Sequence, residues 1–95
     1  MGTQLEMRRL AWKPEKNAWL KLERGLSFEQ IEEAIATGGF KGIAVNRAHP
    51  EQIVIAVMVE GYVVGVPATI QPTVIMLWTA YYSRKLNQRY GGKKI

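Results

Sequence analysis

The chain has 95 residues and a mass of 10.7 kDa, a length at which we expect one compact domain and no second hydrophobic core. Hydrophobic residues make up 47% and charged residues 22% of the sequence, the balance of a globular and not of a disordered protein. The absence of cysteine excludes a disulfide framework, a thiolate zinc site and a cysteine nucleophile. Because there are one histidine and eight acidic residues, we expect neither a metal site nor another cofactor.

Charge is distributed unevenly along the sequence. Residues 1–24 carry a net charge of +3, residues 25–60 carry −3 and residues 61–95 carry +5, which gives the formal net charge of +5. Two basic ends around an acidic centre are typical of a protein that presents one face to a polyanion. They are equally typical of two solvated helices rich in basic residues, so the charge pattern alone leaves both interpretations open.

The first half of the sequence predicts two helices. Pro14 suits the first turn of a helix, where its missing N–H is no loss, and Gly25 is the residue expected just after a helix end. Ser27 and Gln30 form a capping box for a second helix, which should stop at residues 38–39. Helical spacing predicts a buried apolar face made of Leu26, Phe28, Ile31 and Ile35.

From residue 42 onward, the periodicity changes to that of strands. β-branched and aromatic residues gather in four segments separated by Gly, Pro or polar turns. These segments are 42–46, 53–59, 62–69 and 73–82. The apolar run 53–59 predicts a strand buried on both faces, and the short connections favour an antiparallel meander.

The order of elements predicts a single α+β domain over residues 1–95. It has two N-terminal helices, an antiparallel sheet of three to four strands and a short C-terminal helix. Residues 10–12 form either a further short strand or an anchor, and residues 1–9 and 91–95 are predicted to be flexible ends.

The uncharged segment 61–82 has the length of a membrane span. Glycine and proline interrupt it, and its composition is that of strands, so we expect no membrane association. The N-terminus lacks an apolar signal region, which predicts a cytoplasmic protein.

The acidic, histidine and aromatic residues do not form a clear catalytic set. Glu29 and Glu33 fall on the solvent face of the second helix, and the chain contains no aspartate for a serine–histidine–aspartate triad. His49 lies in a polar loop, where it is either a general base or a solvated side chain. The three tryptophans either pack in the core or at an interface, or stack on nucleic-acid bases; they are Trp12, Trp19 and Trp78.

The strongest candidate for chemistry is the segment 83–90. Arg84 with Gln88, and Lys85 with Arg89, stand one helical turn apart on neighbouring faces. Guanidinium groups hold phosphate oxygens in pairs, so this set suits an RNA backbone. It also suits the extra charge that develops when a ribose 2′-hydroxyl attacks its own phosphate. The alternative is a solvated amphipathic helix.

Five short motifs occur in one order between residues 10 and 90. They are Trp12-Lys13-Pro14-Glu15-Lys16-Asn17, Arg24-Gly25-Leu26-Ser27-Phe28-Glu29-Gln30, His49-Pro50-Glu51-Gln52, Glu60-Gly61 and Ser83-Arg84-Lys85 with Arg89-Tyr90. In this order and spacing they resemble the BrnT-type toxins of bacterial toxin–antitoxin operons. The resemblance implies a RelE-like ribonuclease fold and metal-independent RNA cleavage that inhibits translation and growth. It also implies a cognate antitoxin, commonly one with a ribbon–helix–helix domain.

The resemblance implies roles in RNA binding and cleavage for residues of the segment 83–90 and of the first helix. Arg84 and Lys85 would contact the scissile phosphate, with Arg89 and Tyr90 as supporting or proton-transfer groups. Three residues of the first helix would bind RNA, namely Lys16, Lys21 and Arg24.

Two positions and one strand depart from the family pattern. Arg24 stands before Gly25, where many members have histidine. Lys13 replaces an Asp or Asn, so the first helix loses its side-chain N-cap. The last strand, 74–80, lacks the basic residues that the family often places there. An alternative hypothesis is therefore a catalytically degenerate module that binds a protein partner through its apolar sheet, and a third is an RNA-binding domain without cleavage. Because residues 53–82 offer more apolar surface than three short helices can cover, we also expect self-association or antitoxin binding.

Overall fold

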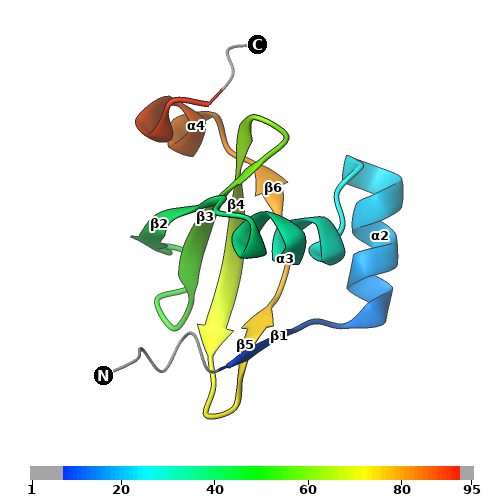
Figure 1. Cartoon of the computed structure of the whole chain (residues 1–95). Coiled ribbons are helices and arrows are strands. Elements are labelled where there is room, and N and C mark those ends of the chain that lie inside the picture. Colours follow the sequence, from blue (N-terminus) through cyan, green and yellow to red (C-terminus); the bar gives the residue numbers. More distant parts are fainter. Residues whose placement is uncertain (1–7, 93–95) are drawn as a thin grey trace.

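The computed structural model describes residues 8–92 and has an α+β architecture (Figure 1). The elements are β1 (Arg9–Ala11), α2 (Pro14–Arg24), α3 (Phe28–Ala36), β2 (Phe40–Val45), β3 (Ile53–Val59), β4 (Tyr62–Ile70), β5 (Val74–Leu77), β6 (Tyr81–Tyr82) and α4 (Arg84–Tyr90). The strands form one six-stranded sheet in the order β1-β5-β4-β3-β2, and β6 also pairs with β4. Strands β1 and β2 are therefore its two edges.

The helices are divided between the two faces of the sheet. Ile55 and Val57 of β3 belong to the main core with residues of α2 and α3, whereas their neighbours Val54 and Ala56 pack against Leu86 of α4. Because successive side chains of a strand point to opposite faces, α2 and α3 cover one face and α4 the other. Figure 1 shows α3 in front of the sheet, α2 beside it and α4 at one end.

Both predicted N-terminal helices are confirmed, with the predicted residues at both ends of α2 and at the start of α3. Helix α3 ends at Ala36, before the predicted stop at residues 38–39. Helix α2 follows Lys13, which provides no side-chain cap, and ends at Gly25 in the left-handed conformation with φ of 64°. At the start of α3, Ser27 Oγ accepts the Gln30 N–H and Gln30 Oε1 accepts the Ser27 N–H. Leu26, Phe28 and Ile31 are buried as expected, and Ile35 is half-buried.

The sheet differs from the prediction in its size and in one pairing. The strand 53–59 is confirmed with its predicted bounds, but the segment 73–82 forms two strands, β5 and β6, and not one. After β5 the Trp78 N–H donates to the Pro67 carbonyl of β4. Residues 78–80 belong to no strand, and β6 then pairs with Val64 and Gly65 of β4. Residues 10–12 provide most of β1, which pairs with β5 in parallel, so the prediction of three to four antiparallel strands is wrong.

The described residues of the predicted flexible ends, 8–9 and 91–92, take part in defined backbone or side-chain contacts. Strand β1 begins at Arg9, and Arg8 Nε donates to the Gln71 carbonyl at 2.7 Å. Gly91 caps α4, and the Gly92 N–H donates to the Asn87 carbonyl at 3.0 Å. The remaining residues of the predicted flexible ends, 1–7 and 93–95, lie outside the described part. None of the helices formed by residues 8–92 is long and apolar enough to cross a membrane.

Candidate nucleic-acid interface

Helix α4 presents its basic residues on one side and its anchoring residues on the other. The Oγ atom of Ser83, the N-cap, accepts the Leu86 N–H at 3.1 Å. Leu86 and Asn87 are buried against the sheet. The opposite arc of the helix is exposed and carries Arg84, Lys85, Gln88 and Arg89. The structure therefore brings three of the four predicted catalytic residues onto one surface.

No acidic side chain neutralises this exposed arc within the described residues. Helix α4 contains no Asp or Glu, and the segment 61–95 has none at all. The ion pairs formed by residues 8–92 lie elsewhere, between Lys21 and Glu29 and between His49 and Glu51. Three uncompensated positive charges within two helical turns attract phosphate groups and can hold them by charge-assisted hydrogen bonds.

Tyr90, the fourth predicted catalytic residue, does not lie with these cations. It is half-buried on the sheet side of α4, in a cluster with Leu86 and Val54. A Cβ atom at Gly42 would lie 2.5 Å from the Tyr90 hydroxyl, so the ring packs directly on the backbone of β2. Helical spacing puts Tyr90 on the buried arc of α4, away from Arg84, Lys85 and Arg89. The prediction that grouped these four residues considered their order in the sequence and not their positions around the helix.

Two of the three predicted RNA-binding residues of α2 contact an aromatic ring. Lys16 Nζ lies 4.2 Å and Arg24 Cζ 4.8 Å from the centroid of the Trp19 ring, at distances typical of cation–π contacts. Arg24 Nη1 also donates to the Ala80 carbonyl at 2.6 Å, which connects the end of α2 to the segment before β6. Lys16, Trp19 and Arg24 thus form a cation–aromatic surface on α2.

Lys21, the third of these residues, pairs with Glu29 of α3. The Lys21 Nζ and Glu29 Oε1 atoms lie 3.8 Å apart, and both side chains are exposed. Glu29 Oε1 also accepts a hydrogen bond from Asn17 Nδ2 at 2.8 Å. This hydrogen bond, followed by a backbone hydrogen bond and by the charge of Lys21, lowers the pKa of Glu29. The charge of Lys21 is therefore partly compensated within the protein.

The lowered pKa of Glu29 predicts a stability contribution that depends on pH. The contribution is present above the ordinary carboxyl pKa of 4.5 and is lost as the pH falls through the lower pKa of the folded state. We expect Glu29→Gln to be less stable than the wild type near neutral pH, and the difference to shrink in acid. Urea denaturation from about pH 7 to about pH 3 measures this. A Glu29→Gln difference that stays constant with pH would contradict the prediction.

The basic residues of α2 and α4 do not form one continuous surface. Leu20 of α2 is buried in the core on one face of the sheet, and Leu86 of α4 is buried on the other. Lys16, Lys21 and Arg24 were predicted to bind the same RNA as the residues of α4, but the two helices that carry these sets pack on opposite faces of the sheet. The surface of α4 is therefore the more compact candidate for a phosphate contact.

Two buried asparagines were missed by the sequence analysis. Asn17 Oδ1 accepts the Phe28 N–H at 2.8 Å, and Asn87 Oδ1 accepts the Val63 N–H at 2.9 Å. Asn17 lies three residues before Leu20 on the inward side of α2, a spacing that could have revealed its burial. Both amides connect an element to its neighbour, and this explains why polar side chains are buried there.

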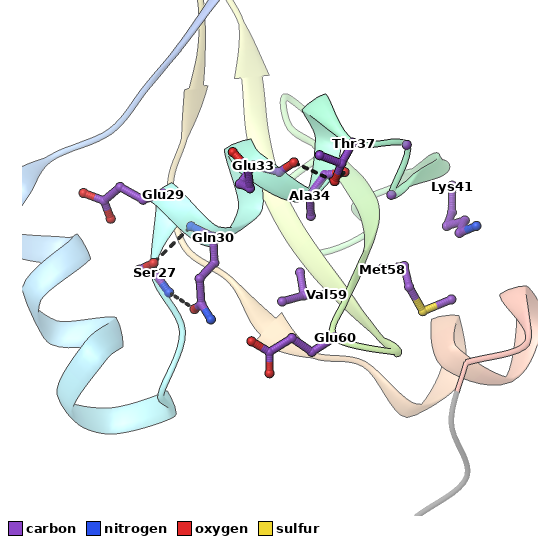
Figure 2. A pocket seen from close by; sticks show the side chains of 12 residues that line it. Ser27, Glu29, Gln30, Glu33, Ala34, Thr37, Lys41, Met58, Val59 and Glu60 are labelled. Carbon is purple, nitrogen blue, oxygen red and sulfur yellow. Dashed lines mark hydrogen bonds between the residues drawn. The ribbon is translucent and has the colours of Figure 1, made fainter.

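An open hollow lies between α3 and the turn that joins β3 to β4 (Figure 2). Its lining includes the carboxylates of Glu29, Glu33 and Glu60, together with Lys41 and the backbone of Gly39. The expectation that Glu29 and Glu33 face solvent is confirmed, since both are exposed. Three carboxylates against one lysine repel phosphate, so this hollow does not suit a nucleic-acid backbone.

His49 is an exposed side chain of the loop between β2 and β3. Its Nδ1 atom lies 3.6 Å from Glu51 Oε2, and both side chains are more than half exposed. Among residues 8–92, no group of three or more His, Cys, Asp or Glu side chains is arranged to hold a metal ion. These observations add no catalytic group to the surface of α4.

Two of the three tryptophans have packing roles. Trp12 stacks on Phe28 with 5.4 Å between ring centroids, and Trp78 Nε1 donates to Thr69 Oγ1 at 2.7 Å. Trp19 is 40% exposed, and base stacking on its ring stays a prediction.

Comparison with protein-family models, with curated proteins and with solved structures finds no match for this chain. A functional proposal therefore rests on the residues, their order in the sequence and the geometry described above. Of these, the exposed and uncompensated basic arc of α4 is the feature with the clearest chemical meaning.

Proposed function

We propose that this protein is a metal-independent endoribonuclease of the toxin type that acts in the cytoplasm. Its cleavage of RNA inhibits translation and growth, and a cognate antitoxin, commonly of the ribbon–helix–helix type, holds it in check. The proposal includes a RelE-like arrangement of helices and sheet. The observation that carries it is the basic arc of α4, and the ordered motifs shared with the BrnT-type toxins support the same class.

The chemistry assigned to this arc is attack of a ribose 2′-oxygen on the adjacent phosphorus. The 2′-hydroxyl gives its proton to solvent water as the bond from the 2′-oxygen to phosphorus forms. The bond from phosphorus to the 5′-oxygen breaks, and the departing 5′-oxygen takes a proton from solvent water. Arg84 and Lys85 hold the non-bridging oxygens and offset the negative charge that develops on them. Arg89 supports them from the next turn. Because this arc carries no strong base, catalysis relies on in-line positioning and charge stabilisation.

The basic residues of α2 have a secondary role in this proposal. Lys16 and Arg24, with Trp19 between them in sequence, bind RNA on the other side of the sheet, and Lys21 adds long-range attraction. Their contribution depends on salt, since it comes from contacts with the phosphate backbone and not from the reacting group.

Purified protein incubated with cellular RNA and excess chelator tests the proposal. We expect cleavage without added metal and products that end in a 2′,3′-cyclic phosphate. An oligonucleotide with one 2′-deoxy nucleotide at the cleavage site should stay intact there, since the nucleophile is missing. RNA that remains intact under these conditions, or cleavage of the deoxy control, would refute the proposed reaction.

The second candidate is a degenerate module that binds a protein partner. Residues 53–82 are mostly buried, and the large apolar side chains exposed there are Ile70 and Tyr82. Further exposed apolar side chains lie on edge strand β2, so an interaction module would use that edge in place of the sheet face first expected. Intact RNA in the test above, together with a stable complex with a partner protein, would favour this candidate.

A further inference from the structure

Strand β2 is an edge of the sheet whose outer side has no partner strand among residues 8–92. From Gly42 to Val45 it contains neither a charged residue nor proline, and Lys41 lies in the irregular step at its beginning. Natural edge strands commonly carry such residues because they prevent another strand from pairing. The last four residues of β2 therefore remain open to strand addition.

The exposed side chains of β2 make this edge apolar. Phe40 is 48%, Ile43 46% and Val45 79% exposed. In the ladder with β3 these residues pair with Val57, Ile55 and Ile53, which pack on the face that α2 and α3 cover. All three apolar side chains thus lie on one face, beside α3 and next to the open edge.

We propose that β2 pairs with β2 of a second copy of this chain, antiparallel and with Ile43 opposite Ile43. A pairing about a two-fold axis uses the same strand on both copies and so closes as a dimer. This register sets Lys41 opposite Val45. The alternative register centred on Ala44 would bring Lys41 of one copy to Arg47 of the other. Two like charges that face each other destabilise the pairing of strands.

Charge complementarity supports a second copy as the occupant. In the proposed register, Arg47, which follows the end of β2 in one copy, comes near Gly39, which precedes β2 in the other. Gly39 lines the acidic hollow together with Glu33 and Glu60 (Figure 2). Arg47 is exposed, and no carboxylate of residues 8–92 pairs with it within one copy. Two-fold symmetry repeats the contact, so each hollow receives an arginine.

Sedimentation velocity of the full chain over a concentration series tests this dimer. A six-residue strand is a small interface, so we expect a dissociation constant on the order of 10 μM. Ile43→Lys places two like charges opposite each other and should raise this constant by at least about tenfold. Arg47→Glu should also weaken the dimer, and adding Glu33→Arg to Arg47→Glu should restore it.

A matched control is Leu22→Lys, which makes the same kind of change at an apolar side chain of α2 that is 85% exposed. It should leave the dimer unchanged, and circular dichroism should show that every variant is folded. A wild type that stays monomeric, an Ile43→Lys variant that associates like the wild type, or a Leu22→Lys variant that dissociates would each overturn the proposal. Failure of the charge swap to restore association would overturn the register.

Discussion

The Arg84→Ala variant is expected to cleave RNA about 100-fold more slowly than the wild type, or slower still, because it loses a charge contact that strengthens in the transition state. Arg84 lies in the first turn of α4, is exposed and has no acidic partner among the described residues. Its guanidinium is therefore available to two phosphate oxygens. The measurement is the initial rate of cleavage of one labelled RNA, with chelator present, at saturating substrate.

RNA binding by Arg84→Ala should fall much less than cleavage. Lys85 and Arg89 remain on the same arc, and Lys16 and Arg24 still attract RNA on the other face. The matched control is Arg9→Ala, the same change at an exposed arginine of β1, which should keep the full rate. Equal rates for the wild type and Arg84→Ala, or an equal loss in Arg9→Ala, would contradict the assignment of α4 as the reacting surface.

The Phe28→Ala variant is expected to lose about 3–5 kcal/mol of the free energy of unfolding, as large-to-small substitutions in a core do. Phe28 is fully buried, stacks on Trp12 at 5.4 Å and lies where α3 meets the sheet. Removing the ring leaves a cavity on the face that holds most of the core. Urea or guanidinium denaturation followed by circular dichroism gives the loss directly.

The chain offers a matched control for this experiment in its other phenylalanine. Phe40 of β2 is 48% exposed, so Phe40→Ala should change the free energy of unfolding by less than about 1 kcal/mol. If the two variants were destabilised equally, the core described on the α2 and α3 face would not be the main source of stability.

The local elements could be predicted from the sequence because their signals are local. Pro14 and Gly25 fix the ends of α2 through backbone conformation, and Ser27 with Gln30 fix the start of α3 through two hydrogen bonds. Such interactions span at most a few residues, so a pattern in the sequence contains all the atoms that make them.

The arrangement of the sheet could not be predicted in the same way. The parallel pairing of β1 with β5 joins Leu10 to Ile75, and the return of β6 to β4 joins Tyr81 to Gly65. Both depend on contacts between distant segments, which short connections and periodicity do not determine. The preference for sequential antiparallel neighbours gives no partner for a short strand at residues 10–12, which pairs with β5 in parallel.

In the candidate site, too, relations within one helix could be predicted and relations between distant elements could not. Helical spacing placed Arg84, Lys85 and Arg89 on one surface, since that relation lies within a single helix. The position of α2 relative to α4 depends on the sheet face that each helix covers. The sheet face depends on contacts between distant segments and cannot be predicted from helical spacing. The positive charge along the sequence therefore indicates basic segments, but not that the helices that carry them pack on different faces of the sheet.

Two tyrosines that pack on glycines, Tyr81 and Tyr90, hold helix α4 against the sheet near both of its ends. A Cβ atom at Gly65 would lie 2.8 Å from the Tyr81 ring, and one at Gly42 would meet Tyr90. One ring therefore contacts bare backbone just before α4, and the other does so at the last residue of α4. A seven-residue helix is too short to persist alone in water. Because it is held near both ends, we expect α4 to keep the spacing of its cations before any ligand arrives. A ligand that matches this spacing therefore loses less affinity to the ordering of the protein backbone.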